Sequence, residues 1–106
     1  MNADDRNQHR SSASVATDRP DRYAKQLISH LGARAEVERA AGATVLGLSM
    51  GVCEVRVVRG AIELQARAAD VASLHRLEGI VQRHLERFGD SDDLEVNWRA
   101  TGAGGA

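Results

Sequence analysis

The stretch VCEVRVVRGAIELQARA, residues 52–68, decides the fold class. On either side of Arg59-Gly60, apolar and polar side chains alternate with a period of two, which is typical of strands with one buried and one solvated face. A two-residue break that ends in glycine favours a tight hairpin. We predict two antiparallel strands whose apolar side chains share one face of a sheet, namely Cys53, Val55, Val57, Ile62, Leu64, Ala66 and Ala68.

The same period of two extends outward from this hairpin. ATVLGLSMG, residues 43–51, places leucine and methionine side chains on one face and predicts a third strand, with Gly51 at the join. SASVAT, residues 12–17, predicts a short first strand, and LEVNWR, residues 94–99, predicts the last one.

A first helix is predicted from the segment DRPDRYAKQLISHLG, residues 18–32, because its apolar side chains recur at helical spacing. Asp18 is a good capping residue, and Pro20 suits the first turn, where its missing N–H would have had no partner. Gly32 is expected to end the helix in a left-handed conformation.

A second helix is predicted to begin after Asp70, which is also a good capping residue, and to run to about Phe88. Its apolar stripe consists of Leu74, Leu77, Val81, Leu85 and Phe88. Gly89 is expected to end it.

These segments predict the order β-α-β-β-β-α-β in an α+β fold. We expect a two-layer sandwich in which two helices cover one face of a mostly antiparallel sheet of four to five strands. One domain is predicted over residues 12–100, because the ends of the chain have few side chains to bury. Residues 1–11 and 101–106 are therefore expected to be disordered tails.

Composition and charge exclude several classes of protein. The chain has 14 basic and 15 acidic residues and a net charge of −1, so it lacks the clustered basic surface of nucleic-acid-binding proteins. No apolar run approaches the roughly 20 residues that span a membrane. A single cysteine excludes an internal disulfide and suits a reduced, cytoplasmic setting.

Three residues are candidates for chemistry: His30 and His84 at the edges of the two helical stripes, and Cys53 on the apolar face of the sheet. Imidazole and thiolate ligands suit zinc or iron, so convergence of the three predicts a metal site. The alternative is structural: a buried cysteine commonly acts as a small hydrophobic residue. His84 would then fill the seam between helix and sheet and bond a group on a neighbouring element.

The chain also resembles a bacterial family. SVATDRPDRYAKQLISHLG, GVCEVRV, DVASLHRLEGIVQRHLERFG and LEVNWR, between about Ser14 and Arg99, are similar to the domain of unknown function 2218 family. The resemblance implies a small intracellular α+β domain with an accessory role linked to iron or siderophore uptake. Relatives carry a second histidine and a lysine where this chain has Ala33 and Arg34.

Three functions remain open at this point. The first is a non-enzymatic binding or accessory domain for a small ligand that the sequence does not identify. The second is a small enzyme or metal-binding protein that uses Cys53, His84 and His30. The third is a homodimeric or other protein-interaction module. A cleft that opens onto Cys53 and His84 would favour chemistry, whereas a sealed core there would favour binding through the surface.

Overall fold

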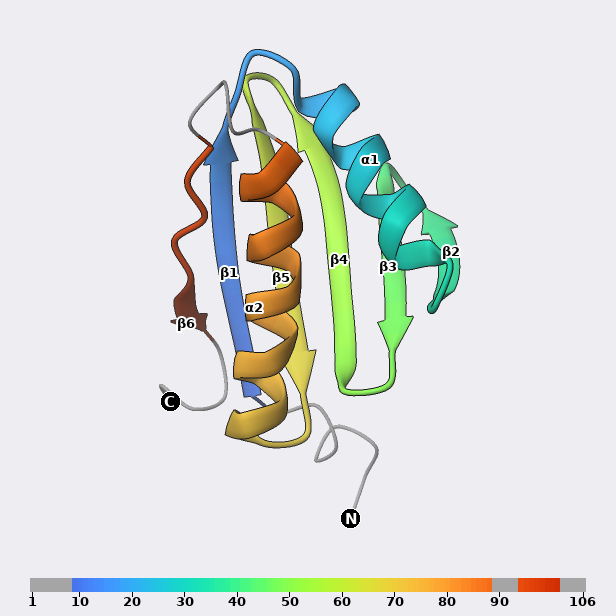
Figure 1. Ribbon diagram of the computed structural model, residues 1–106, viewed down its shortest axis with the longest axis vertical. Helices are drawn as coiled ribbons and strands as arrows, with labels where there is room; N and C mark the ends of the chain where they lie inside the picture. Colours follow the sequence, from blue (N-terminus) through green and yellow to red (C-terminus); the bar gives the residue numbers. More distant parts are fainter. Residues whose placement is uncertain (1–8, 89–93, 102–106) are drawn as a thin grey trace.

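The computed structural model describes residues 9–88 and 94–101 of the chain. The elements are β1 (His9–Ala16), α1 (Pro20–Gly32), β2 (Glu36–Ala40), β3 (Ala43–Leu48), β4 (Gly51–Val58), β5 (Ala61–Ala68), α2 (Val71–Phe88) and β6 (Arg99–Thr101). The strands form one antiparallel sheet in the order β2-β3-β4-β5-β1-β6. Both helices cover the same face of this sheet (Figure 1), so the predicted two-layer α+β sandwich is confirmed.

The sheet has six strands, so the prediction of four to five was wrong. The strand missing from the predicted order is β2, which pairs with β3 at the edge of the sheet. In the sequence EVERA, Val37 is the only large apolar side chain, and it is 44% exposed. An edge strand with charged side chains buries little and resists pairing with other chains, so it carries only a weak apolar signal.

The first strand begins earlier than the sequence predicts. His9, Arg10 and Ser11 were assigned to the N-terminal tail, but they pair with residues 66–68 of β5. Ser11 is buried, although its hydroxyl side chain gave no apolar signal. Residues 1–8 and 102–106 of the predicted tails lie outside the described residues.

The segment LEVNWR is only partly a strand. β6 begins at Arg99, and residues 94–98 form no ladder, so the predicted strand over 94–99 was wrong. Leu94 and Val96 are nevertheless buried. The N–H of Val96 donates instead to the Glu86 carboxylate of α2 at 3.2 Å. The alternation in LEVNWR thus predicted correctly which side chains are buried. It did not predict pairing, because the Val96 N–H donates to a side chain of α2 and not to a strand.

The caps of α1 differ from the prediction at both ends. The capping position is Arg19 rather than Asp18, and no side chain caps the helix there. At the other end Gly32 is helical, and Ala33 follows it with a right-handed φ of −63°. Glycine gives room here for another reason, because a Cβ on Gly32 would lie 3.2 Å from Cγ2 of Val37, a tight contact. The glycine lets β2 pass close to the helix end.

The start of α2 confirms the prediction. The carboxylate of Asp70 accepts the N–H of Ser73 at 2.7 Å, and this hydrogen bond lowers the pKa of Asp70 below its ordinary value. The predicted stop at Gly89 lies outside the described residues. Among residues 9–88 and 94–101, no helix is both long and apolar enough to cross a membrane.

The core lies between the helices and the inner face of the sheet. It is largely aliphatic, and its largest fully buried side chains include Leu27, Leu46, Ile62, Leu64, Leu77 and Leu85. Of the apolar row predicted from residues 52–68, only Val57 is exposed. The hairpin at Arg59-Gly60 is confirmed, with Gly60 at a φ of +76°.

Candidate functional site

A cleft of about 610 Å³ opens where the end of α1, the β3–β4 turn and the middle of α2 meet. Apolar side chains line much of it, namely Leu31, Leu48, Met50 and Ile80. The groups in its lining that can hydrogen-bond or carry positive charge are His30, Arg34, Ser49 and His84. Among residues 9–88 and 94–101, no carboxylate lines the cleft. The cleft therefore combines an apolar wall with groups that favour a negatively charged ligand.

A second hollow of about 570 Å³ lies on the opposite face of the sheet, over β1 and β5. Its side chains include Glu63 and Arg99 together with serine and amide groups. Both charged groups are exposed. Because opposite charges and water-exposed groups share this surface, it has neither an apolar wall nor one sign of charge, and it is the weaker candidate.

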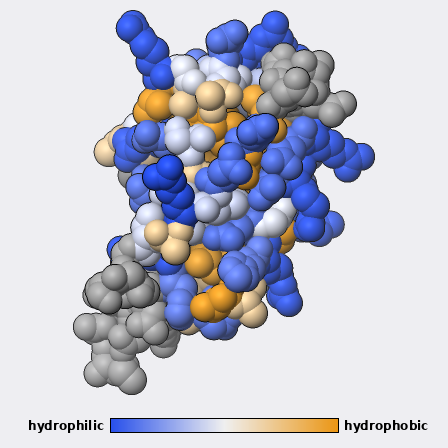
Figure 2. All heavy atoms as spheres, turned by 90° about the vertical axis from the view of Figure 1, so that its left-hand side faces the viewer, coloured by the Kyte–Doolittle hydropathy of each residue, from blue (hydrophilic) through white to orange (hydrophobic). Residues whose placement is uncertain are grey.

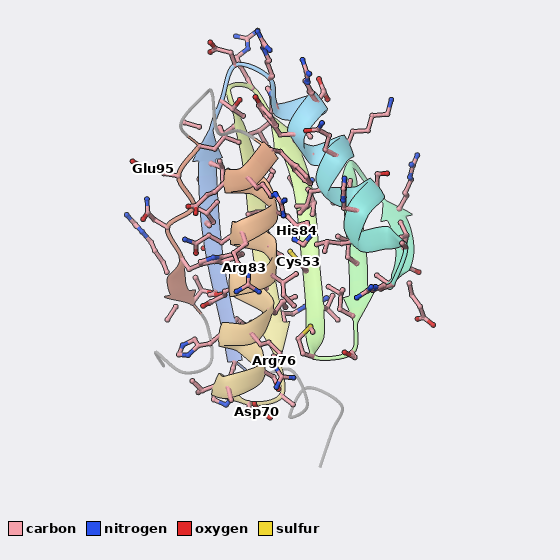
Figure 3. All side chains as sticks on the ribbon, viewed as in Figure 1. Cys53, Asp70, Arg76, Arg83, His84 and Glu95 are labelled. Carbon is pink, nitrogen blue, oxygen red and sulfur yellow. The ribbon has the colours of Figure 1, made fainter. Side chains whose placement is uncertain are left out.

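The structure brings His30 and His84 together across the seam between α1 and α2. Their ring centroids lie 6.0 Å apart, and both rings contact Phe88, with centroid distances of 4.8 Å and 5.9 Å. His30 is exposed and His84 is half-buried. In Figure 3, His84 lies on the side of α2 that faces α1. The helical spacing in the sequence thus placed both histidines on the correct faces.

The hydrogen bond of His84 stays within its own helix. Its Nδ1 lies 2.8 Å from the carbonyl oxygen of Ile80, one turn earlier. The expected bond to a neighbouring element was therefore wrong. A carbonyl oxygen only accepts hydrogen bonds, so Nδ1 carries the proton of the neutral ring and Nε2 keeps its lone pair.

Cys53 has no exposed surface and lies in the sheet between Leu46 and Ala66. Burial raises the pKa of its thiol to about 12, and the carboxylate of Glu54 adds to the effect. A thiol in this state is not an activated nucleophile, because the thiolate is the reactive form. Cys53 does not line the cleft.

The described residues contain no group of three histidine, cysteine or acidic side chains that could hold a metal ion. Cys53 therefore does not join His30 and His84 in such a group. Of the three metal ligands expected from the sequence, only the two histidines lie together. Glu78 of α2 and Tyr23 of α1 do not line the cleft either.

The sequence did not single out Arg34 and Met50 as site residues. Arg34 follows the C-terminus of α1 and belongs to no periodic stripe. Met50 was assigned to the apolar face of the third strand, but β3 ends at Leu48 and Met50 lies in the β3–β4 turn. The one signal was the family resemblance, in which Ala33 and Arg34 replace a histidine and a lysine. Both positions line the cleft.

We expect His84→Ala to change the free energy of unfolding by less than about 1 kcal/mol. The variant loses ring contacts, but alanine favours helix and leaves Ile80 within the helical hydrogen-bond pattern. Urea denaturation of the parent, His84→Ala and His84→Gln measures this directly. A loss of 2 kcal/mol or more in His84→Ala, reduced in His84→Gln, would instead show that the ring is held for packing and its hydrogen bond.

Comparisons with known proteins give the family but no activity. Residues 12–99 match a family described as "Uncharacterized protein conserved in bacteria (DUF2218)". A similar solved structure is the NMR structure of PA4090 from Pseudomonas aeruginosa, with 26% sequence identity and a TM-score of 0.72. The alignment covers 90% of this chain and 99% of that one. No curated protein matches the chain. Because the family match spans most of the sequence, the chain belongs to the DUF2218 family of uncharacterised bacterial proteins.

Proposed function

We propose that this protein is a non-enzymatic binding domain that takes a small organic anion into the cleft beside His30 and His84. The observation that carries the proposal is the composition of the cleft. The described part of the chain gives it apolar walls, a guanidinium and two imidazoles, and contributes no carboxylate to its lining. Small-molecule sites commonly combine an apolar lining with a few placed polar groups that orient the ligand.

Each part of the lining has a role in this proposal. The apolar body of the ligand would lie against Leu48, Met50 and Ile80. Its acidic group would lie near Arg34, whose planar guanidinium suits a carboxylate with two parallel hydrogen bonds. An imidazole N–H of His30 can add a further donor. Arg34 is exposed, so its charge is available without the cost of burying it in the free protein.

An enzyme that uses Cys53 and His84 has less support. Nucleophilic catalysis by cysteine needs an accessible thiol of lowered pKa beside a base. Cys53 has the opposite properties, because it is fully buried and its pKa is raised.

A homodimeric interaction module also has less support. Among the described residues, the exposed large apolar side chains are Val37, Val57 and Val71, which belong to three different elements. Figure 2 shows the side of the molecule along which β6 runs, where hydrophilic side chains predominate and apolar ones form small patches. Stable interfaces usually need a larger continuous area.

The resemblance suggests a narrower role, in which the anion is an acidic metal chelator handled during iron or siderophore uptake in the cytoplasm. The cleft supports the acidic and partly apolar character of such a ligand. The link to iron rests on the family resemblance alone, so iron-free and iron-loaded chelators belong in the ligand screen beside simple carboxylates.

We expect aliphatic and aromatic carboxylates to shift the NMR signals of residues that line the cleft. Arg34→Glu should weaken their binding about tenfold, equivalent to about 1.4 kcal/mol, because it reverses the charge beside the acidic group. Arg59→Glu is the matched control: it makes the same change at an exposed hairpin turn outside the cleft and should keep the parental affinity. Equal binding of the corresponding uncharged amides would contradict the proposal.

A further inference from the structure

We propose that His30 and His84 form a two-imidazole site for a divalent transition-metal ion, which both rings bind through Nε2 at the mouth of the cleft. The ion would join α1 to α2, and its other coordination positions would open onto the cleft that both histidines line. The described residues offer no group of three or more such ligands, so water or a bound anion would complete the coordination.

The distance between the two rings suits a shared ion. When two imidazoles bind one ion through Nε2 at a metal–nitrogen distance of about 2.0–2.1 Å, their centroids lie roughly 5–6 Å apart. The observed separation is 6.0 Å. His30 is exposed at the end of α1, so its ring can turn toward the ion with little repacking.

The hydrogen bond of His84 prepares its free nitrogen for a metal. Histidine ligands commonly donate their other ring N–H to a backbone carbonyl or a carboxylate, which fixes the tautomer and orients the ring. In this structure Nδ1 makes that contact with Ile80, and Nε2 of the neutral ring keeps the lone pair. Packing of this ring against Phe88 further restricts its orientation.

The ligand type selects the class of ion. Imidazole suits copper, nickel and zinc, whereas magnesium and calcium prefer oxygen ligands. For one set of nitrogen ligands, copper(II) should bind more tightly than nickel(II) or zinc(II). Metal binding at this site does not require the organic anion. If the proposed function holds, the acidic group of that anion can occupy an open coordination position on the ion.

The test uses full-length, metal-free protein without a histidine tag, titrated with Cu²⁺, Ni²⁺, Zn²⁺ and Mg²⁺ by calorimetry. We expect one saturable site for the first three ions, tightest for Cu²⁺, and none for Mg²⁺. His30→Ala and His84→Ala should each weaken binding at least tenfold. His75→Ala is the matched control, because His75 is an exposed histidine on α2 outside the cleft, and it should leave the affinity unchanged within twofold.

Ala33→His supplies a gain-of-function test. Ala33 lines the cleft three residues after His30, so an imidazole there can add a third ligand and should tighten Zn²⁺ binding at least tenfold. Arg34→Glu should still bind the metal while its affinity for the organic anion falls about tenfold, so the two proposals can fail separately. Two results would overturn the metal site. One is that Cu²⁺, Ni²⁺ and Zn²⁺ show no saturable binding to the parent protein. The other is that His30→Ala binds these ions as tightly as the parent does.

Discussion

Gly51→Ala is expected to destabilise the protein by about 3 kcal/mol, the upper end of the usual cost of overpacking a core. Gly51 is buried at the start of β4. A Cβ at this position would overlap the backbone oxygen of Arg67 and would lie 3.1 Å from Cβ of Ala68 and 3.2 Å from Cδ2 of Leu77. The backbone oxygen belongs to the β4–β5 ladder, so the clash cannot be relieved by rotating one side chain.

Gly47→Ala provides the matched control in the neighbouring strand. A Cβ on Gly47 would meet Cβ of Glu36 at 3.7 Å, an ordinary contact, so its effect should stay within about 0.5 kcal/mol. Guanidinium denaturation of the parent, Gly51→Ala and Gly47→Ala at one pH measures the change in the free energy of unfolding for each variant. If Gly51→Ala unfolds like Gly47→Ala, then β4 and β5 are not held as closely as the structure indicates.

The requirement for glycine at position 51 shows where sequence reasoning reached its limit. The sequence places Gly51 at a strand join, but the turn itself is Ser49-Met50, and Gly51 is already paired with Leu48. Close approach of β5 and α2 is what demands the missing side chain. Such a contact joins residues distant in the chain, and no local pattern reports it.

Elements with a strong apolar period were predicted well, because their period follows directly from the burial of one face. The hairpin over residues 52–68 and the stripe of α2 bury one face each, and burial imposes the period. β2 escaped prediction because an edge strand buries little, and residues 94–98 were assigned to a strand because alternation reports burial rather than pairing.

Some residues of the candidate site could be placed from periodic patterns in the sequence, and others could not. His30 and His84 were placed by their angles on two helices, and the structure brings them together. Cys53 was also placed correctly on the inner face, but whether that face is sealed or open depends on how the helices pack over it. Arg34 lies outside the periodic elements, and Met50 was assigned to a strand face rather than to a turn, so only the folded chain brings them to the cleft.

The free energy of unfolding is expected to fall by about 2 kcal/mol between about pH 8 and pH 10.5 through Cys53 alone. Burial raises the pKa of this thiol from 9.0 to about 12. Above pH 9 the unfolded chain therefore loses a proton that the folded chain keeps, and deprotonation favours unfolding. This contribution to stability is fully present below pH 9 and is lost as the pH rises toward 12, by about 1.4 kcal/mol for each pH unit in that range.

Cys53→Ala isolates this effect from the other groups that titrate at high pH. At about pH 8 alanine should cost roughly 1 kcal/mol, because it removes a sulfur atom from a closed core. That deficit should shrink as the pH rises and reverse sign by about pH 10.5, since alanine has no proton to lose. Denaturation curves of both proteins across this range measure the difference, and a thiol reagent at pH 8 should modify the parent only after unfolding. A constant deficit, with rapid modification of the folded parent, would mean that Cys53 is accessible and would restore the enzyme hypothesis that its burial now opposes.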